Sequence, residues 1–187
     1  MLFRVLVVLL TGLAGQAMCQ TWQIDRGTSI SVDVPWRGTS VEVRFAPPTG
    51  VIEFDPDAPQ RTRATLRVDA GSATTGAAPV DALVRSEGYL ATDRFQTIDF
   101  ELLSLVRTSS STADVAGRLT LRGTTLPVDF KARVLRYGPS EADPSRFEAG
   151  FDLAGVIDRR QFGSTGGLPH VAAMLPVRVR LMLSSVN

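Results

Sequence analysis

The chain has 187 residues, a formal net charge of +1 at pH 7, a single His and a single Cys. This length suits one domain and is sufficient to bury a core without disulfides or a metal. The near-neutral charge excludes the basic surface on which nucleic-acid binding depends, so no nucleic-acid partner is expected. One His and one Cys cannot supply the ligands of a zinc site.

The first 19 residues differ in composition from the rest of the chain and predict a secretory signal. Arg4 is followed by an apolar run over residues 5–10 and then by small residues, which is the order of a signal peptide's regions. The run is too short to cross a bilayer, which takes about 20 apolar residues. We therefore predict that residues 1–19 are removed and that residues 20–187 form one periplasmic or secreted domain without stable membrane insertion. The cleavage position stays open, as does lipid attachment at Cys19.

Nine short runs of alternating apolar and polar residues follow from residue 29 onward. In the first, Ile30, Val32 and Val34 alternate with Ser31 and Asp33. This period of two predicts antiparallel strands with one apolar and one solvated face. One-sided strands in this number form a sandwich or a barrel, and a barrel is favoured because closure removes exposed edges. The runs cover residues 30–34, 41–45, 52–54, 64–68, 98–102, 115–121, 128–134, 147–153 and 177–181.

Two segments break the alternation and predict short helical insertions. Residues 80–91 have apolar side chains at helical spacing, and residues 157–163 predict a helical turn ending at Gly163, which can adopt positive φ. Residues 122–125 predict a tight hairpin between two strong strands. The expected fold is therefore all-β, an antiparallel β-barrel of about eight strands with one or two short helical insertions.

Candidates for catalytic chemistry are few. His170 stands alone in a Gly/Pro-rich loop, no G-x-S-x-G elbow is present, and a solvated role for this His is favoured. A glycosidase-type hydrolase needs only two carboxylates, but most carboxylates here alternate outward on strands. Asp81 and Asp158 lie in the helical segments beside Arg85 and Arg159, where local ion pairing or capping is favoured over ligand contact. We expect a protein that is not an enzyme, with a hydrolase using Asp81 or Asp158 as the less favoured alternative.

Six short motifs follow one another in a distinctive order. They are WQID at 22–25, TGVIEFDP at 49–56, TG at 75–76 with VDALVRS at 80–86, FQTIDF at 95–100, GRLTLRGTTLPV at 117–128 and IDRRQFG at 157–163. In this order the chain resembles the YceI-like family of secreted, lipocalin-like polyisoprenoid-binding proteins. The resemblance implies an antiparallel barrel whose apolar lumen holds a long isoprenoid chain, a polyprenyl or quinone-type lipid, without established catalytic residues.

Two positions depart from the family pattern. The family often carries a His at the end of the first strand and another in the helix, where this chain has Trp36 and Leu83. If those histidines hold a polar headgroup in relatives, this protein binds a different headgroup or only an apolar chain.

Aromatic residues are the predicted ligand contacts. Phe45, Phe54 and Phe100 fall on the inward phase of their strands, and Trp36 stands at a barrel rim in phase with Val34. Tyr89 lies in the segment that would cap the lumen, and the last candidate lies under the second helical turn. The predicted set is Trp36, Phe45, Phe54, Tyr89, Phe100 and Phe162.

The predicted function is that of an exported carrier whose lumen holds an isoprenoid lipid or quinone, with no other cofactor. The small inward residues Ala64, Gly117, Ala132 and Ala149 favour a lumen with free space. Core packing also explains the aromatic residues, so a stress-related structural barrel with a packed lumen is the alternative. The sequence leaves a homodimer open.

Overall fold

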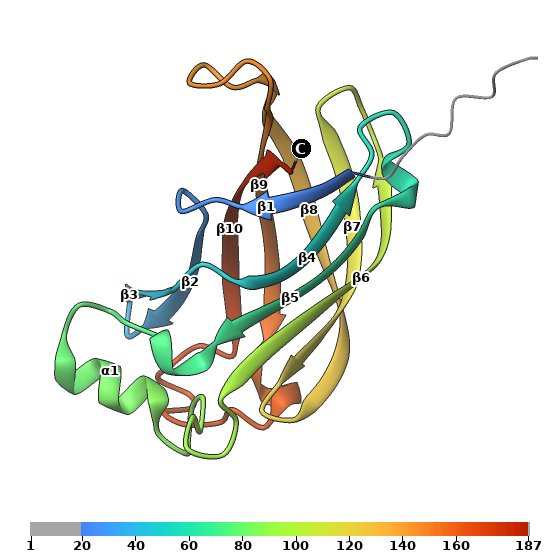
Figure 1. The fold of residues 1–187 in the computed structure, drawn as a ribbon. Coiled ribbons are helices and arrows are strands. Elements are labelled where there is room, and N and C mark those ends of the chain that lie inside the picture. Colours follow the sequence, from blue (N-terminus) through green and yellow to red (C-terminus); the bar gives the residue numbers. More distant parts are fainter. Residues whose placement is uncertain (1–19, 187) are drawn as a thin grey trace, which may run out of the picture.

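The computed structural model describes residues 20–186, so the predicted signal segment and Cys19 lie outside the described residues. Strands dominate this part of the chain (Figure 1), and no helix in it has the length and apolar character needed to cross a membrane. The strands are β1 (Gln20–Ile24), β2 (Ser29–Trp36), β3 (Thr39–Phe45), β4 (Thr49–Phe54), β5 (Arg63–Asp69), β6 (Thr97–Arg107), β7 (Thr112–Leu121), β8 (Thr124–Pro139), β9 (Phe147–Asp158) and β10 (Met174–Ser185). The helix is α1 (Ala78–Arg85), and the 3₁₀ turns are η1 (Pro59–Arg61), η2 (Ala70–Ser72) and η3 (Arg159–Phe162).

Eight of these strands close into a ring. Their order is β1-β4-β5-β6-β7-β8-β9-β10, and antiparallel pairing of β10 with β1 completes the circle. Closure pairs the backbone groups that an open sheet would leave at its edges. The predicted antiparallel barrel of about eight strands is therefore confirmed.

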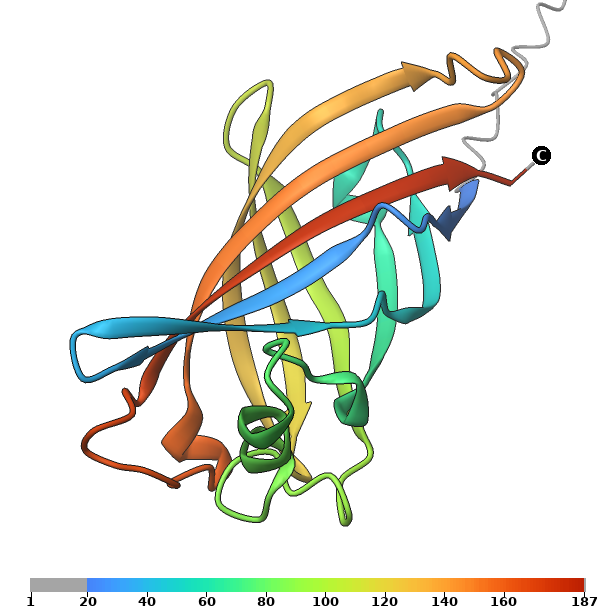
Figure 2. The ribbon, with the colours of Figure 1, turned by 90° about the vertical axis from the view of Figure 1, so that its left-hand side faces the viewer.

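The hairpin of β2 and β3 lies outside the ring and extends one wall (Figure 2). Strand β10 pairs with β9 along one edge. Along its other edge, residues 177–180 pair with β2 and residues 183–185 pair with β1. The outer strand β3 is not left fully open, because Arg44 exchanges two backbone hydrogen bonds with Thr74, at 2.8 and 2.9 Å. The first hairpin thus connects the barrel wall to the segment that leads into α1.

The predicted tight turn and both predicted helical segments are present, with shifted bounds. Arg122 and Gly123 form a two-residue loop with φ of 52° and 74°, as a hairpin of this length requires. Helix α1 ends at Arg85 rather than near residue 91, because the chain folds back and the N–H groups of Leu90 and Thr92 donate to the last helical carbonyls. The second segment is the 3₁₀ turn η3, closed by Gly163 at φ 74°.

Two phenylalanine rings lie flat against the barrel wall over glycines of neighbouring strands. A Cβ atom at Gly117 would stand 2.3 Å from the ring of Phe100, and one at Gly155 would stand 2.7 Å from the ring of Phe130. The two rings meet edge to face with centroids 6.1 Å apart. Glycine at these positions lets the rings sit on the backbone instead of projecting into the lumen.

Candidate functional site

The lumen is lined by two separate apolar clusters. The upper cluster is built around Trp22, Ile52, Ala149 and Leu183, which are buried. The lower cluster is built around Val115, Phe130 and Val177. Partly buried apolar side chains surround both groups: Ile24, Phe54, Ala64, Leu66, Phe151 and Leu181 in the upper, and Val32, Phe100, Leu102, Leu105, Val128, Ala132, Leu153, Ile157 and Val179 in the lower.

Many of these inward-facing side chains keep some solvent exposure although strands surround them. Leu66, Leu153 and Val179 are examples, one from each of three strands of the ring. Side chains in a fully packed interior leave few voids as large as a water molecule. The partial exposure therefore indicates free space inside the ring of strands, with an apolar lining.

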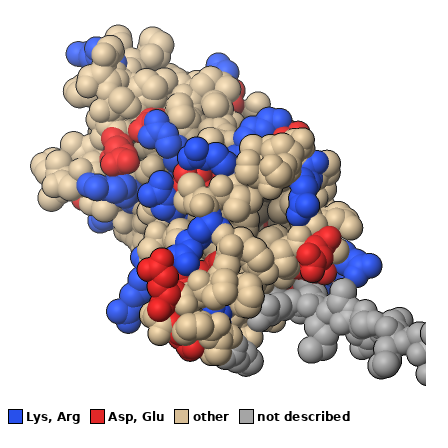
Figure 3. All heavy atoms as spheres, turned by 90° about the horizontal axis from the view of Figure 1, so that it is seen from above, with Lys and Arg blue, Asp and Glu red and all other residues tan. Residues whose placement is uncertain are grey.

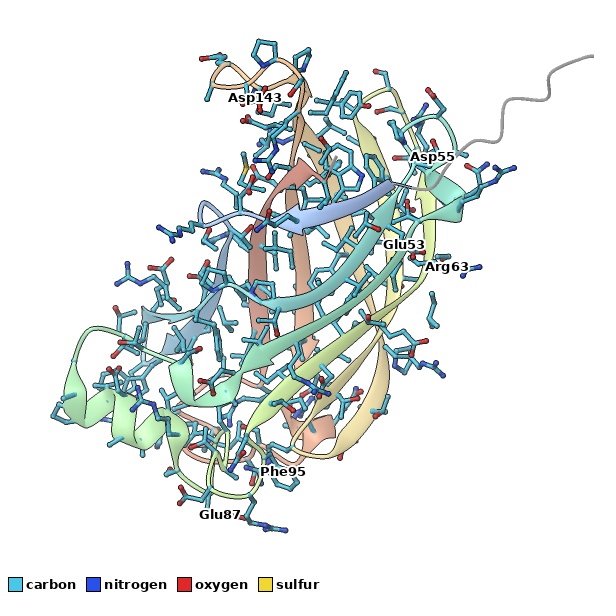
Figure 4. The ribbon with its side chains drawn as sticks, in the orientation of Figure 1. Glu53, Asp55, Arg63, Glu87, Phe95 and Asp143 are labelled. Carbon is cyan, nitrogen blue, oxygen red and sulfur yellow. The ribbon has the colours of Figure 1, made fainter. Side chains whose placement is uncertain are left out.

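One end of the barrel is closed by α1 and by the loops at residues 86–96 and 163–173 (Figure 1, bottom). Three arginines hold this end together by donating to backbone carbonyls of the segment that precedes α1 and of the two loops. Arg85 donates to Ala73 O at 2.8 Å, and Arg122 Nη1 donates to the carbonyls of Glu87 and Tyr89 at 2.7 and 2.9 Å. Glu87 and Phe95 mark this end in Figure 4. We call it the closed end.

Arg159 is the most heavily engaged of these residues and is only 3% exposed. Its guanidinium donates to four backbone carbonyls in the loop that follows η3: Ser164 at 2.9 Å, Gly166 at 2.7 Å, Val171 at 3.0 Å and Ala172 at 2.8 Å. Its cationic carbon also lies 5.6 Å from the centre of the Tyr89 ring. Burial lowers the pKa of Arg159, yet a guanidinium stays protonated at any physiological pH.

The opposite end carries a chain of aromatic contacts. Phe151 meets Phe54 edge to face at 5.4 Å between centroids, and Phe54 meets Trp22 at 5.9 Å. Trp22 lies 6.3 Å from Tyr137, which lies 5.7 Å from Phe147. Trp22 is held in place because its indole N–H donates to Phe54 O at 3.0 Å. Phe151 and Phe54 are partly buried and Trp22 is only 2% exposed, whereas Tyr137 and Phe147 at the outer end are 47% and 39% exposed.

The six predicted contact residues fall into three places. Phe54 and Phe100 lie in the upper and lower cluster of the lumen. Tyr89 and Phe162 belong to the closed end, where Phe162 is buried at 3% exposure. Trp36 and Phe45 end β2 and β3; Trp36 is 45% exposed and pairs with Val171 of the closed-end loop. The structure therefore brings only two of the six to the lumen proper.

The carboxylates considered for catalysis are occupied by local partners. Asp81 accepts the Thr75 N–H at 2.6 Å and the hydroxyls of Thr75 and Thr74 at 2.7 and 2.9 Å. These hydrogen bonds, that of the Thr75 backbone foremost, lower the pKa of Asp81. Asp158 pairs with Arg160 at 2.7 Å, not with the expected neighbour, and this hydrogen bonding lowers its pKa. Both carboxylates fix local structure at the closed end.

Within residues 20–186, no group of three or more His, Cys, Asp or Glu side chains is arranged so that it could hold a metal ion. His170 is exposed, and its carbonyl accepts the Arg37 N–H at 3.3 Å.

The outer wall carries two hollows, of about 740 and about 590 Å³, that differ from the lumen in chemistry. The larger crosses β7 to β10 and β2 and is lined by ion pairs, among them Lys131–Asp114 at 2.7 Å and Arg133–Asp152 at 3.1 Å. The smaller includes Arg118 and Glu101, paired at 2.7 Å. Such charged linings suit solvent better than an apolar molecule, whereas the lumen lining is apolar.

Sequence reasoning missed the residues that distinguish the two ends. The sequence predicts Arg122 only as part of a turn, and Tyr137 lies outside the alternating runs, so neither is a predicted site residue. Arg159 was noted only as a neighbour of Asp158. Trp22 was quoted in a motif but not taken as a contact, although a Trp opening the first strand of a barrel is a usable signal.

Comparison with known proteins identifies the relatives of this fold. The sequence profile of the YceI-like domain matches residues 22–184. A UPF0312 protein of Pseudomonas paraeruginosa is 31% identical over 155 residues, which cover 80% of this chain and 79% of that protein. A UPF0312 protein of Ectopseudomonas mendocina is 30% identical over 176 residues, which cover 90% of this chain and 91% of that protein.

Solved structures show the same barrel. BcnA of Burkholderia cenocepacia matches with a TM-score of 0.73 at 18% identity, covering 88% of this chain and all (100%) of that one. A polyisoprenoid binding domain from Saccharophagus degradans, implicated in plant cell wall breakdown, matches with a TM-score of 0.68 at 15% identity, covering 89% and 99%. At such identities the likeness concerns the fold.

Proposed function

We propose a function from one premise: the chain belongs to the YceI-like family. Its lumen binds the long apolar chain of an isoprenoid lipid, of polyprenyl or quinone type. The observation that carries this proposal is the partial exposure of apolar side chains inside a closed ring of strands. A solved neighbour of the same fold is named for polyisoprenoid binding, which supports the same class of ligand.

Burial of apolar surface supplies the affinity. Each CH₂ group removed from water contributes about 0.8 kcal/mol, so a long prenyl chain needs little polar help. Phe54 and Phe100, one in each cluster, would contact the chain along its length. Trp36, Tyr89 and Phe162 would enclose its far end, since they lie at or beside the closed end. Phe45 lies at the other end of the β2–β3 hairpin, opposite Ile30, and would contact the ligand from that side.

Binding is favoured over catalysis. The carboxylates of Asp81 and Asp158 are engaged by local hydrogen bonds and by Arg160, and neither belongs to the lumen clusters. A carrier in the periplasm also fits the leader-like composition of residues 1–19. N-terminal sequencing of periplasmic material tests export: an intact Met1 would contradict it.

Filling the lumen from a small inward residue tests ligand binding without deleting a contact. Ala132 is partly buried and packs at the lower cluster, whereas Ala154 faces outward on β9. We expect Ala132→Phe to abolish binding of a fluorescent prenyl probe while keeping the melting temperature, and Ala154→Phe to bind like the parent. Native mass spectrometry of the purified parent protein should show a co-purifying lipid.

A packed lumen predicts a different set of results. Overpacking a full core costs about 1–3 kcal/mol, so Ala132→Phe would then lower the melting temperature markedly. The parent protein would also fail to bind the probe. This pair of outcomes would replace the carrier by a structural barrel.

A further inference from the structure

The hairpin of β8 and β9 extends beyond the rest of the barrel at the end opposite α1 (Figures 1 and 2). Tyr137 pairs with Ala149, which is fully buried on the inward phase, and Phe147 lies two residues from Ala149 on the same face of β9. Both aromatic side chains therefore continue the lumen wall. They are nevertheless 47% and 39% exposed, because the hairpin extends past the neighbouring strands of residues 20–186.

The exposed pair is physically continuous with the interior. Ring contacts between 5.4 and 6.3 Å lead from Phe151 inside the lumen through Phe54 and Trp22 to Tyr137 and Phe147 outside. Trp22, only 2% exposed, is the buried link of this row, whereas Phe54 and Phe151 are partly buried on the lumen side and Tyr137 and Phe147 are exposed. An apolar chain passing from the exposed pair into the lumen would therefore move over aromatic surface that Trp22 supports from below.

The closed end offers no comparable path. Arg122 and Arg159 fasten its loops, and Arg85 ties α1 to Ala73, through hydrogen bonds to backbone carbonyls. Ala73, Ala91 and Phe162 at this end are at most 3% exposed. Entry there would require breaking several charge-assisted hydrogen bonds at once, each among the stronger kind in proteins.

We propose that an isoprenoid enters and leaves the lumen over Tyr137 and Phe147. An uncharged headgroup that carries an oxygen stays beside this pair, where its oxygen accepts a hydrogen bond from the Tyr137 hydroxyl. The tail then extends past Trp22 and Phe54 toward the closed end. This inference rests on the proposed function and adds the entrance and the class of headgroup.

The charges around Tyr137 favour an uncharged headgroup. Asp55, 7% exposed, is held in place as its carboxylate accepts the Asp57 N–H at 2.9 Å, and Asp55 marks this end in Figure 4. Burial, together with the charges of Asp57 and Asp55, raises the pKa of Tyr137, so its hydroxyl remains a donor. Arg107 and Arg146 also lie at this end, but each donates to a backbone carbonyl. A phosphate head beside Tyr137 would face the two carboxylates.

Viewed from above, this end shows charges of both signs among uncharged surface (Figure 3). The approach is therefore not a basic surface of the kind that selects anionic lipids. The exposed rings of Tyr137 and Phe147 and the Tyr137 hydroxyl recognise the ligand instead.

Rates of association test the entrance. The double variant Tyr137→Ser/Phe147→Ser removes the exposed rings, and Leu83→Ser removes a similarly exposed side chain (51%) from α1 at the closed end. With a fluorescent geranylgeraniol analogue in stopped flow, we expect association to slow about tenfold in the double variant and to match the parent in Leu83→Ser. Phe147→Ser alone should give an intermediate rate and serves if the double variant is unstable.

Competition tests the headgroup with the same parent protein. Geranylgeraniol should displace the probe better than geranylgeranyl monophosphate, and Tyr137→Phe should weaken the alcohol about fivefold by loss of one hydrogen bond. Parent-like association in the double variant, or slowed association in Leu83→Ser, overturns the entrance. Stronger competition by the phosphate overturns the headgroup. A parent protein that binds no probe at all refutes the proposed function itself.

Discussion

Arg159 provides the sharpest test of how the closed end is held together. In Arg159→Met the apolar stem is kept while the guanidinium is lost, leaving the carbonyls of Ser164, Gly166, Val171 and Ala172 without their donor. Each buried acceptor left unpaired costs about 1–3 kcal/mol, but this loop lies at the surface, where water replaces part of the loss. We therefore expect the free energy of unfolding to fall by about 3–5 kcal/mol, the range for breaking a buried charged network.

The neighbouring Arg160 supplies the matched control. Arg160→Met makes the same change of charge one residue away, but the Arg160 side chain is 56% exposed and pairs only with Asp158. Exposed pairs of this kind contribute little to stability, so the control should unfold close to the parent in urea. If Arg159→Met loses less than about 1 kcal/mol, as ordinary surface changes do, the carbonyl network is not what closes this end.

Three further outcomes follow from the contacts. Gly117→Ala places a Cβ 2.3 Å from the Phe100 ring and should lower the free energy of unfolding by about 1–3 kcal/mol. In the control Gly138→Ala the new Cβ has no atom within 4 Å, so urea denaturation should show no change. Equal losses in the two variants would contradict the packing of Phe100 on Gly117. Because the pKa of Asp81 is lowered in the folded protein, its carboxylate stabilises the fold fully above its ordinary pKa of 3.8, and this stabilisation is lost as pH falls through the folded-state pKa. Acid should therefore destabilise the parent more steeply than Asp81→Asn. Parallel curves of urea midpoint against pH for the two proteins would refute this. Trp22→Phe should cost about 1 kcal/mol in thermal unfolding through the lost indole hydrogen bond; an unchanged melting temperature would show that bond to be inert.

The barrel could be predicted from the sequence because its signal is local and repeated. A period of two in apolar residues is imposed by the pleat of each strand, and all nine alternating runs lie in strands. The two-residue turn at Arg122 and Gly123 was equally legible, since positive φ favours glycine there. The first strand, β1, could not be predicted, because its five residues, 20–24, are too few to show a clear alternation of apolar and polar side chains.

The candidate site was only half visible for a physical reason. Alternation says which side chains face inward, and so placed Phe54 and Phe100 in the lumen. It does not say how far each strand extends past its neighbours, and therefore could not show that Tyr137 and Phe147 would continue the wall into solvent. The alternation also cannot predict that an arginine such as Arg159 will bind backbone carbonyls, because every residue has a carbonyl and the sequence does not mark which ones are bound.

The two ends of the barrel differ in the side chains that build them. A loop that closes a barrel carries backbone carbonyls that need donors, and one guanidinium satisfies several of them: four in the case of Arg159. Closing the end in this way keeps polar groups satisfied without drawing apolar side chains out of the lumen. The opposite end also has arginine–carbonyl hydrogen bonds, from Arg107 to Pro56 and from Arg146 to Ser185, but it carries in addition exposed aromatic rings, which tolerate both water and an apolar chain. The buried Arg159 thus satisfies the carbonyls of the loop that closes one end, and the exposed rings of Tyr137 and Phe147 stand at the other end, where, in a carrier, a ligand must pass.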